Sequence, residues 1–254
     1  MSVSLLNTRP DPMGTELQRL CSQHGIDSLH RPMISTQPLP FQVGESLVSD
    51  LARADIAWIF ISRTAVNRFA ECTLQAKRTF APTGRVIAVG PGSRSQLEQH
   101  FPALRGRILC PAQANSESLV TMTELQPSEV SKAWLIKGDG GRTLMAEHFK
   151  ANNIELEPAN LYRRCPVQYE RVDVRQWQDY THFLATSVDI AMALFDNIHT
   201  GMTEDEQSTL LGKVKWLVLS ERIKAFLLTL SVPASQIFIC EQSDNSSIIN
   251  NINI

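Results

Sequence analysis

The chain has 254 residues, of which 43% are hydrophobic and 20% are charged, and its 24 basic and 26 acidic side chains nearly cancel. This is the composition of an ordinary globular protein, and the length suits two domains of about 100–150 residues each. The charge balance argues against a surface for nucleic acid or for an anionic membrane, because either usually requires a basic excess. It does not exclude an acidic small ligand, because backbone amides bind anions without adding net charge.

The sequence predicts neither a targeting segment nor a membrane span. The N-terminal segment MSVSLLNTRPDPMG has a short apolar run, without a basic leader or an apolar core of signal-peptide length. No stretch approaches the roughly 18 apolar residues that span a bilayer. The five cysteines lie far apart and form no C-x-x-C pair, so neither disulfides nor a zinc site are expected. We therefore expect a reduced, cytoplasmic protein without a bound metal.

Short apolar runs of strand length alternate with segments of helical period. In the first half, the expected strand and helix pairs are 3–6 with 14–24, 57–61 with 65–80, and 86–89 with 93–101. In the second half, they are 133–136 with 142–152, 183–185 with 189–197, and 216–219 with 221–230, followed by a strand at 237–239 and a partial helix in the tail. Uninterrupted apolar strands between helices are typical of a parallel sheet buried on both faces. The sequence therefore predicts an α/β protein with doubly wound layers.

A weak internal repeat relates the two halves of the chain. Ser62 and Ser187 each follow an expected strand and are 125 residues apart. The strand, turn and helix expected at 5–20 also resemble those at 135–149. Such a repeat favours two similar sheets.

Two proline-containing segments, PLPFQ at 38–42 and RRCPV at 163–167, are expected to connect the domains. Two crossings indicate that the chain leaves a first domain, builds a second one and then returns. The expected first domain is 1–35 plus 169–254, the second is 42–160, and the connections are 36–41 and 161–168. The alternative is a simple two-domain chain divided near Pro127–Ser128. We expect a ligand between the domains, outside the carboxyl ends of the strands.

The common catalytic motifs are absent from the sequence. GDGGR at 138–142 lacks the spacing of dinucleotide-binding and P-loop motifs, and neither H-E-x-x-H nor G-x-S-x-G occurs. The six histidines are scattered singly, so each is expected at the surface or in packing. The reaction is therefore expected to depend on positioning more than on reactive groups.

Small hydroxyl or glycine residues recur at the expected strand-to-helix turns. One interpretation is helix N-capping, which favours serine and threonine. The other is that several helix N-termini open on one cleft and offer N–H groups to carboxylates, at roughly 1.5–3 kcal/mol for each charged hydrogen bond. Both interpretations stay open from sequence. The positions are Thr8, Ser62, Ser93, Gly138, Thr186, Ser187 and Ser220.

Tyr162 stands where the chain is expected to cross between domains. Its ring could enter the cleft, and a phenol, which is protonated at neutral pH, would act there as a proton donor. The alternative is that the ring packs against the connection. The neighbouring Arg163 and Arg164 are interpreted as solvated charges.

Several segments, taken in order, resemble the uroporphyrinogen-III synthase family. In the first half these are NTRP at 7–10, FISRTAV at 60–66 and AVGPGS at 88–93. In the second half they are KGDGGRTLMAEHF at 137–149, LYRRCPVQY at 161–169, ATS at 185–187 and LVLSERI at 217–223. GDGGR followed by LYRR is the most specific pair.

The resemblance implies two similar doubly wound parallel-sheet domains, joined by a two-stranded antiparallel link, with the first domain discontinuous. It implies a hydro-lyase of porphyrin and haem biosynthesis that closes hydroxymethylbilane to uroporphyrinogen III, with loss of water and inversion of the last pyrrole ring. It implies no metal and no cofactor, and that Tyr162 assists departure of the hydroxyl group. The substrate-binding residues implied are Arg9, Ser62, Gly90, Ser93, Gly138, Thr186, Ser187 and Ser220.

The expected partners are the tetrapyrrole substrate and product, with a transient contact to the upstream hydroxymethylbilane synthase. A monomer is expected because no long apolar stripe is left unassigned. The main alternative is a non-catalytic, two-lobed α/β binding protein for a small anionic ligand, which a signal peptide would favour. A further alternative is an inactive domain of the tetrapyrrole pathway, which loss of Tyr162 would favour.

Overall fold

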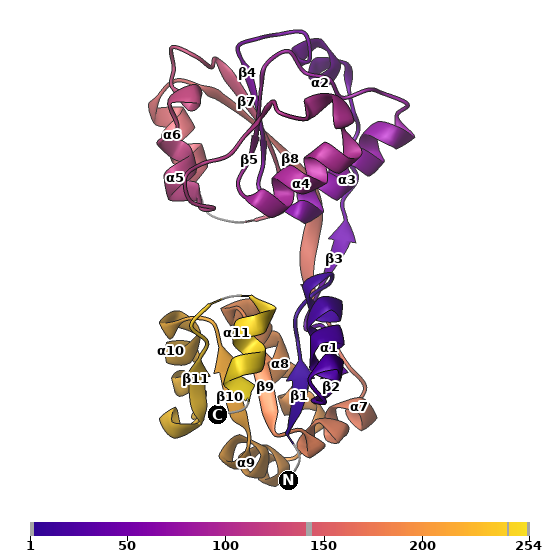
Figure 1. The fold of residues 1–254 in the computed structure, drawn as a ribbon, viewed down its shortest axis with the longest axis vertical. Helices are drawn as coiled ribbons and strands as arrows, with labels where there is room; N and C mark the ends of the chain where they lie inside the picture. Colours follow the sequence, from indigo (N-terminus) through magenta and orange to yellow (C-terminus); the bar gives the residue numbers. More distant parts are fainter. Residues whose placement is uncertain (1–2, 141–143, 243, 253–254) are drawn as a thin grey trace. The chain divides into compact units, whose positions relative to one another are not determined.

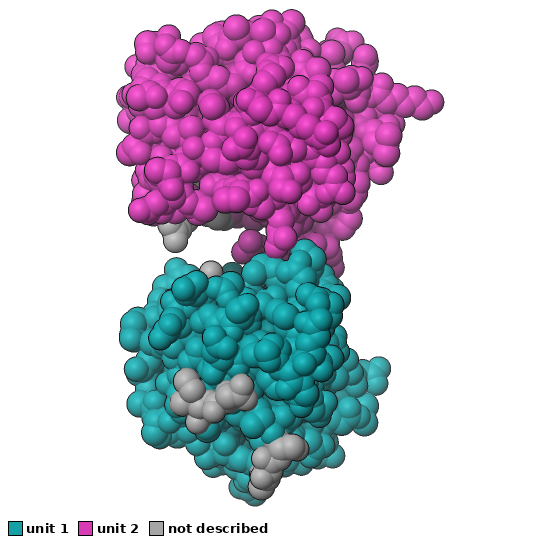
Figure 2. Space-filling view, in the orientation of Figure 1, with its two compact units in different colours: residues 1–35, 165–254 teal, residues 36–164 magenta. Residues whose placement is uncertain are grey.

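The computed structural model describes residues 3–140, 144–242 and 244–252. The chain forms two compact units (Figures 1 and 2). The first unit combines residues 1–35 with 165–254, and the second is the continuous stretch 36–164. Within the described residues, no helix is both long and apolar enough to cross a membrane.

The first unit contains a five-stranded sheet in the order β11-β10-β9-β1-β2, and its strand pairs run parallel. Its strands are β1 (Ser4–Asn7), β2 (Asp27–His30), β9 (His182–Ala185), β10 (Lys215–Val218) and β11 (Ile237–Ile239). Its helices are α1 (Met13–Gln23), α7 (Arg171–Gln176), α8 (Val188–Gly201), α9 (Glu204–Lys213), α10 (Glu221–Thr229) and α11 (Asn245–Ile252), with short 3-10 turns at Trp177–Asp179 and Ala234–Gln236.

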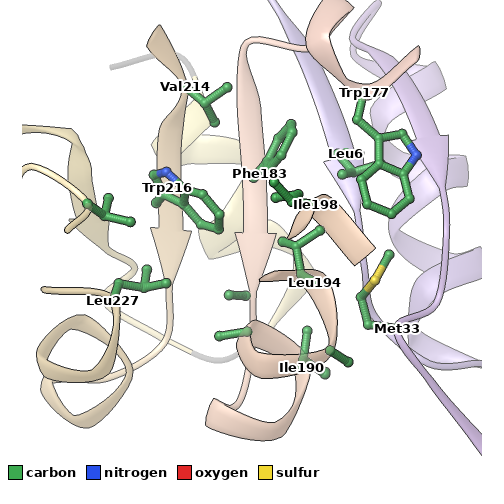
Figure 3. Close-up of a cluster of buried hydrophobic side chains, with 14 of the residues drawn as sticks. Leu6, Met33, Trp177, Phe183, Ile190, Leu194, Ile198, Val214, Trp216 and Leu227 are labelled. Atoms are coloured by element: carbon green, nitrogen blue, oxygen red, sulfur yellow. The ribbon is translucent and has the colours of Figure 1, made fainter. Parts of the chain in front are cut away.

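Both faces of this sheet are buried. Phe183 and Trp216, from neighbouring strands, point to the same side and pack edge to face, with ring centroids 5.4 Å apart (Figure 3). Leu194 of α8 belongs to the same cluster. The alternate residues Leu184 and Leu217 belong to a second cluster on the other face. The predicted doubly wound arrangement is therefore confirmed for this unit.

The second unit contains a six-stranded sheet in the order β3-β8-β7-β4-β5-β6. Its strands are β3 (Ile34–Pro38), β4 (Ile56–Phe60), β5 (Arg85–Ala88), β6 (Ile108–Leu109), β7 (Lys132–Gly138) and β8 (Glu155–Pro166). Its helices are α2 (Glu45–Asp50), α3 (Arg63–Gln75), α4 (Pro91–His100), α5 (Ser116–Val120) and α6 (Leu144–Ala151), with 3-10 turns at Pro102–Leu104 and Thr123–Leu125.

The second sheet is also covered on both faces. Trp58 and Phe60 of β4 pack with Phe69 of α3 in one buried cluster, which we call the α3-side core. Ile59, between them in sequence, packs with Phe149 of α6 in another cluster on the opposite face, the α6-side core. Successive side chains of β4 thus pack in cores on opposite faces of the sheet, as expected for a central strand of a doubly wound sheet.

The strands β3 and β8 form the predicted antiparallel link. The Val167 N–H donates to the Met33 carbonyl at 2.9 Å, and the Leu39 N–H donates to the Leu161 carbonyl at 3.0 Å. From the first hydrogen bond to the second, the residue number rises by six on the β3 side and falls by six on the β8 side, as it does in antiparallel strands. The predicted link is therefore confirmed.

The two sheets share one strand order, which confirms the predicted internal repeat. The first sheet reads β2-β1-β9-β10-β11 and the second, without β3, reads β8-β7-β4-β5-β6. β9 and β4 are therefore equivalent, and Ser187 and Ser62 follow them at the same position. The direction of strand succession reverses between β1 and β9 in one sheet, and between β7 and β4 in the other. Ligands of open α/β sheets bind outside the carboxyl ends at such switch points.

Two expectations from sequence were wrong in their extent. The helix expected over 65–80 ends at Gln75, because Lys77 adopts a left-handed conformation (φ 52°) and the Arg78 N–H closes back on the Thr73 carbonyl at 2.9 Å. The segment 163–167, expected to break regular structure, continues β8 as far as Pro166. The first two residues of the helix expected over 142–152 lie outside the described residues.

Candidate functional site

Four strands lead into helices through the same short turn. β4, β5, β9 and β10 each end two residues before a helix N-cap, and the helix begins at the next residue. The N-caps are Ser62, Gly90, Ser187 and Ser220. Each serine oxygen accepts the N–H of the residue three positions on, at 3.0, 3.2 and 3.4 Å respectively. The capping interpretation is therefore confirmed for the three serines.

Three residues expected at such caps have other positions. The hydroxyl of Thr8 donates to the carbonyl of Leu184 on the adjacent strand β9, and α1 begins only at Met13. Ser93 is the third residue of α4 and is 7% exposed. Thr186 precedes Ser187, the N-cap of α8. The capping interpretation was therefore wrong for these three residues.

The helices that follow the four short turns differ in the charge of their first turns. The first turns of α8 and α10 contain Asp189 and Glu221, which already offset the positive end of each helix dipole. The first turns of α3 and α4, both fully described, contain no acidic residue. Arg63 opens α3, and its Cδ lies 3.2 Å from where a Cβ on Gly92 of α4 would stand. The α3 and α4 N-termini thus form the more favourable place for an anion.

Arg9 connects the turn after β1 to α11. The side chain is 4% exposed, and its NH1 donates to Asn245 Oδ1 at 2.7 Å. The Arg9 carbonyl bonds to His30 Nε2 at 2.8 Å. Burial raises the pKa of the nearby Cys240 thiol to about 11, although the Arg9 charge opposes that shift. These contacts favour a packing role for Arg9, in contrast to the substrate contact expected from the resemblance.

Tyr162 is buried in the α3-side core and is 3% exposed. Its hydroxyl lies 3.0 Å from Ser62 Oγ, the N-cap of α3. Its ring crosses the end of β7 so closely that a Cβ on Gly138 would stand 2.7 Å from two ring carbons. Tyr162, Ser62 and Gly138 therefore form one contact group at the β7–β4 switch point.

The pairing of β7 with β8 shifts at Tyr162. Lys137 is opposite Asn160, but Gly138 is opposite Tyr162, so Leu161 is an extra residue on β8, as in a β-bulge. Leu161 and Tyr162 consequently pack in the same core cluster. Reasoning from sequence missed this bulge. The available signal was the adjacent apolar pair Leu161 and Tyr162, which interrupts the alternation expected of a strand.

The other expected site residues are distributed over the two units. In the first unit, Thr186 and Ser187 follow β9, and Ser220 follows the hydrogen-bonded neighbour β10. In the second unit, Gly90 and Ser93 follow β5, which is the neighbour of β4. Each set is brought together at the carboxyl edge of its own sheet.

The residues around Tyr162 are partly solvated, as expected. Arg163 Nε lies 3.4 Å from Asp139 Oδ2, and both side chains are largely exposed. The Asp139 N–H donates to the Tyr162 carbonyl at 2.7 Å. The last two residues of GDGGR lie outside the described residues.

Two cavities lie apart from the candidate residues. One of about 420 Å³ lies against α11 in the first unit. Another of about 320 Å³ lies beside the end of α3 and includes Leu74 and Phe101. Neither cavity is lined by the candidate residues. Within 3–140, 144–242 and 244–252, no group of three or more His, Cys, Asp or Glu side chains is placed to hold a metal ion.

Comparison with known proteins gives one consistent family. The family model described as "Uroporphyrinogen-III synthase HemD" matches residues 15–250. The uroporphyrinogen-III synthase of Escherichia coli (strain K12) is 28% identical over 255 residues, covering 97% of this chain and 98% of that protein. The enzyme of the same name from Salmonella typhimurium is 25% identical over 262 residues, with the same coverage of 97% and 98%.

Solved structures agree on the fold. A mutant uroporphyrinogen III synthase from the extremely thermophilic bacterium Thermus thermophilus aligns with a TM-score of 0.61 at 16% identity, covering 99% of this chain and 98% of that chain. The uroporphyrinogen-III synthetase of Helicobacter pylori 26695 aligns with a TM-score of 0.59 at 11% identity and the same coverage, 99% and 98%. The family match takes in the Tyr162 contact group and the four capped turns, and the chain therefore belongs to the uroporphyrinogen-III synthase family.

Proposed function

We propose that this enzyme closes hydroxymethylbilane to uroporphyrinogen III, with loss of water and inversion of the last pyrrole ring, as a lyase that needs no cofactor. The observation that carries the proposal is the family match over residues 15–250. The Tyr162 contact group supports it, because it fixes one phenol hydroxyl at a sheet edge where α/β proteins bind ligands.

The chemistry needs little from reactive side chains. A pyrrole nitrogen of the substrate expels the neighbouring hydroxyl, which leaves as water after receiving a proton, and an electrophilic azafulvene forms. Unassisted closure of this intermediate gives the symmetric type I ring. The enzyme must direct attack to the substituted carbon of the last ring. A preference of about 100-fold corresponds to only about 2.7 kcal/mol in barrier height. Orientation and fixed dipoles can supply that difference.

In this proposal Tyr162 donates its phenolic proton to the departing hydroxyl. The substituted carbon bears no hydrogen, so its attack gives a spiro intermediate, whose bond to the neighbouring methylene bridge then breaks. The bridge rejoins at the unsubstituted α-carbon of the same ring, and the proton lost from that carbon returns to the phenol, so no net proton is consumed by the side chain. Tyr162 is 3% exposed, so only a small part of its surface is available to a substrate.

The substrate carboxylates are proposed to bind at the capped turns. Gly90 and Ser93 belong to the α3 and α4 pair, which carries Arg63 and no acidic first-turn residue. Thr186, Ser187 and Ser220 are proposed as contacts in the first unit. The carboxylates would accept from backbone N–H groups, at roughly 1.5–3 kcal/mol for each bond.

The remaining proposals concern organisation in the cell. We propose that the two units are separate domains connected by 36–41 and 161–168, and that the protein is a cytoplasmic monomer. A transient contact with hydroxymethylbilane synthase would shorten the path of a substrate that cyclises spontaneously.

The test is the isomer ratio formed from freshly generated hydroxymethylbilane, with and without the protein, measured by chromatography after oxidation to porphyrins. The proposal expects a shift from type I to type III. An unchanged type I product with well-folded protein would refute it. Saturable ligand binding under those conditions would instead support a two-lobed anion-binding protein.

A further inference from the structure

The bulge in β8 decides which face of the sheet Tyr162 occupies. Side chains alternate between faces along a strand, and the pair Ile136 and Ala159 lies in the α3-side core. If the register continued unchanged, Gly138 would oppose Leu161, and Tyr162 would project toward the α6 side. The extra residue moves Tyr162 onto the α3 side, because a one-residue slip exchanges the two faces. The bulge therefore brings the phenol to the N-terminus of α3.

Gly138 provides the space that this placement needs. An added Cβ would stand 2.7 Å from Tyr162 Cε2 and Cζ and 3.2 Å from Cδ2. Gly138 does not adopt a left-handed conformation, so the requirement at this position is for space. This close approach gives a steric reason for a glycine at position 138, opposite Tyr162.

Ser62 has one hydroxyl proton and two lone pairs. One lone pair accepts the Ala65 N–H at 3.0 Å, which anchors the oxygen at the helix N-terminus. The hydroxyl proton is then available to the phenolic oxygen of Tyr162, 3.0 Å away. In this orientation the proton of the phenol stays free for transfer to a substrate. The Ser62 O–H and the positive end of the α3 dipole both stabilise negative charge that develops on the phenolic oxygen.

We infer that Ser62 and Gly138 act on the reaction through Tyr162, as positioning residues: Ser62 donates its hydroxyl hydrogen bond to the phenolic oxygen, and Gly138 leaves room for the ring. This inference rests on the proposed function, in which Tyr162 is the proton donor. It replaces direct substrate contact as the role of these two residues. Removing the Ser62 hydroxyl, or filling the space at Gly138, therefore lowers kcat and leaves KM nearly unchanged.

The test is a double-mutant cycle between position 62 and position 162. Ser62→Ala, Ser62→Gly and Ser62→Thr are each made in the natural chain and in Tyr162→Phe, and kcat and KM for type III formation are measured. Glycine keeps the N-cap preference but removes the hydroxyl, whereas threonine keeps both. The expected result is about a 10-fold loss of kcat in Ser62→Ala and Ser62→Gly, equal to about 1.4 kcal/mol. Ser62→Thr retains most activity.

The Tyr162→Phe background separates positioning from substrate contact. There, Ser62→Ala produces no further loss of kcat, because the phenol through which it acts is already absent. Thr203→Ala is the matched control: it removes the N-cap of α9, a helix of the first unit, where the Thr203 hydroxyl accepts the Glu206 N–H at 3.3 Å. Thr203→Ala is expected to lower the free energy of unfolding in urea about as much as Ser62→Ala does, and to leave kcat unchanged.

Three results would overturn the inference. One is a rise in KM without loss of kcat in the Ser62 variants, and another is an equal loss of kcat in both backgrounds, since either indicates direct contact with substrate. The third is full activity of Tyr162→Phe. Failure of the proposed function itself is distinguishable, because the natural chain would then form only the type I product before any variant is made.

Discussion

Replacing Gly138 with alanine adds one methyl group at the most crowded contact of the candidate site. The new Cβ would lie 2.7 Å from two carbons of the Tyr162 ring, whereas ordinary contacts begin at 3.4 Å, so the ring must move by about 0.7 Å. Tyr162 is 3% exposed, and its displacement therefore compresses the surrounding core. Overpacking of this kind lowers the free energy of unfolding by about 1–3 kcal/mol. The smaller backbone entropy of alanine in the unfolded chain raises it by about 0.4–1 kcal/mol. We expect a net loss of about 1–2 kcal/mol.

The assay is urea unfolding of Gly138→Ala, alone and combined with Tyr162→Ala, which removes the ring. In the combined variant the added methyl group should cost nothing, because its clash partner is gone. Gly212→Ala in α9 is the matched control, since a Cβ there meets nothing within 4 Å, and it should stabilise by about 0.5–1 kcal/mol. An equal loss of stability with and without the Tyr162 ring would refute the steric reasoning.

Three further predictions concern catalysis, buried charge and acid stability. Tyr162→Phe should lower the rate of type III formation about 10- to 100-fold while the protein stays folded, as a single-turnover assay with circular dichroism would show. Lys132→Met should cost about 1–3 kcal/mol in urea and leave KM unchanged, because it removes the ammonium group 3.1 Å from the buried Asp50 carboxylate, which keeps the Trp134 N–H at 2.8 Å, at the end of β7 opposite to the site. The hydrogen bond from Arg53 lowers the pKa of Asp55 from 3.8 to about 2, so its contribution to stability is complete above about pH 4 and is lost as the pH falls toward 2. Asp55→Asn should flatten the stability profile in that window, and an unchanged acid-unfolding curve would contradict the assignment.

The central strands could be predicted because they are buried on both faces. β4 was expected at 57–61 and lies at Ile56–Phe60, and β10 was expected at 216–219 and lies at Lys215–Val218. The edge strands β2 and β6 could not, because they are short, and β3, which is largely polar, was expected only from the family resemblance. Helix α9 was missed although its capping box of Thr203 and Glu206 was readable in the sequence.

Proline was misleading in β8 for an identifiable reason. Pro166, which was expected to break regular structure, is the last residue of β8, and the pairing of β8 with β7 ends earlier, at Tyr162. The next residue, Val167, donates its N–H to Met33 on the β3 side, so the missing N–H of Pro166 falls on the opposite, open edge. Proline is tolerated in such a position, and sequence alone does not show which side of a strand is open.

The candidate site could be predicted where its chemistry is local. The N-cap serines Ser62, Ser187 and Ser220 were readable, because capping involves residues three positions apart. The bond between Ser62 and Tyr162 joins residues 100 positions apart and depends on a single extra residue in β8. No local pattern fixes that register, and the contact became visible only with the pairing of β7 and β8.

The discontinuity of the first unit has a consequence for the order of folding. β1 is an interior strand whose partners are β2 and β9, and β9 begins at His182. During synthesis from the N-terminus, the second unit emerges with all its strands before β9, β10 and β11 exist, and domains generally fold as they emerge. The edge of the apolar strand β1 that later pairs with β9 therefore stays unpaired while about 150 residues are synthesised. During this interval β1 can associate wrongly, and the interval ends only when the last third of the chain supplies the three remaining strands of the first sheet.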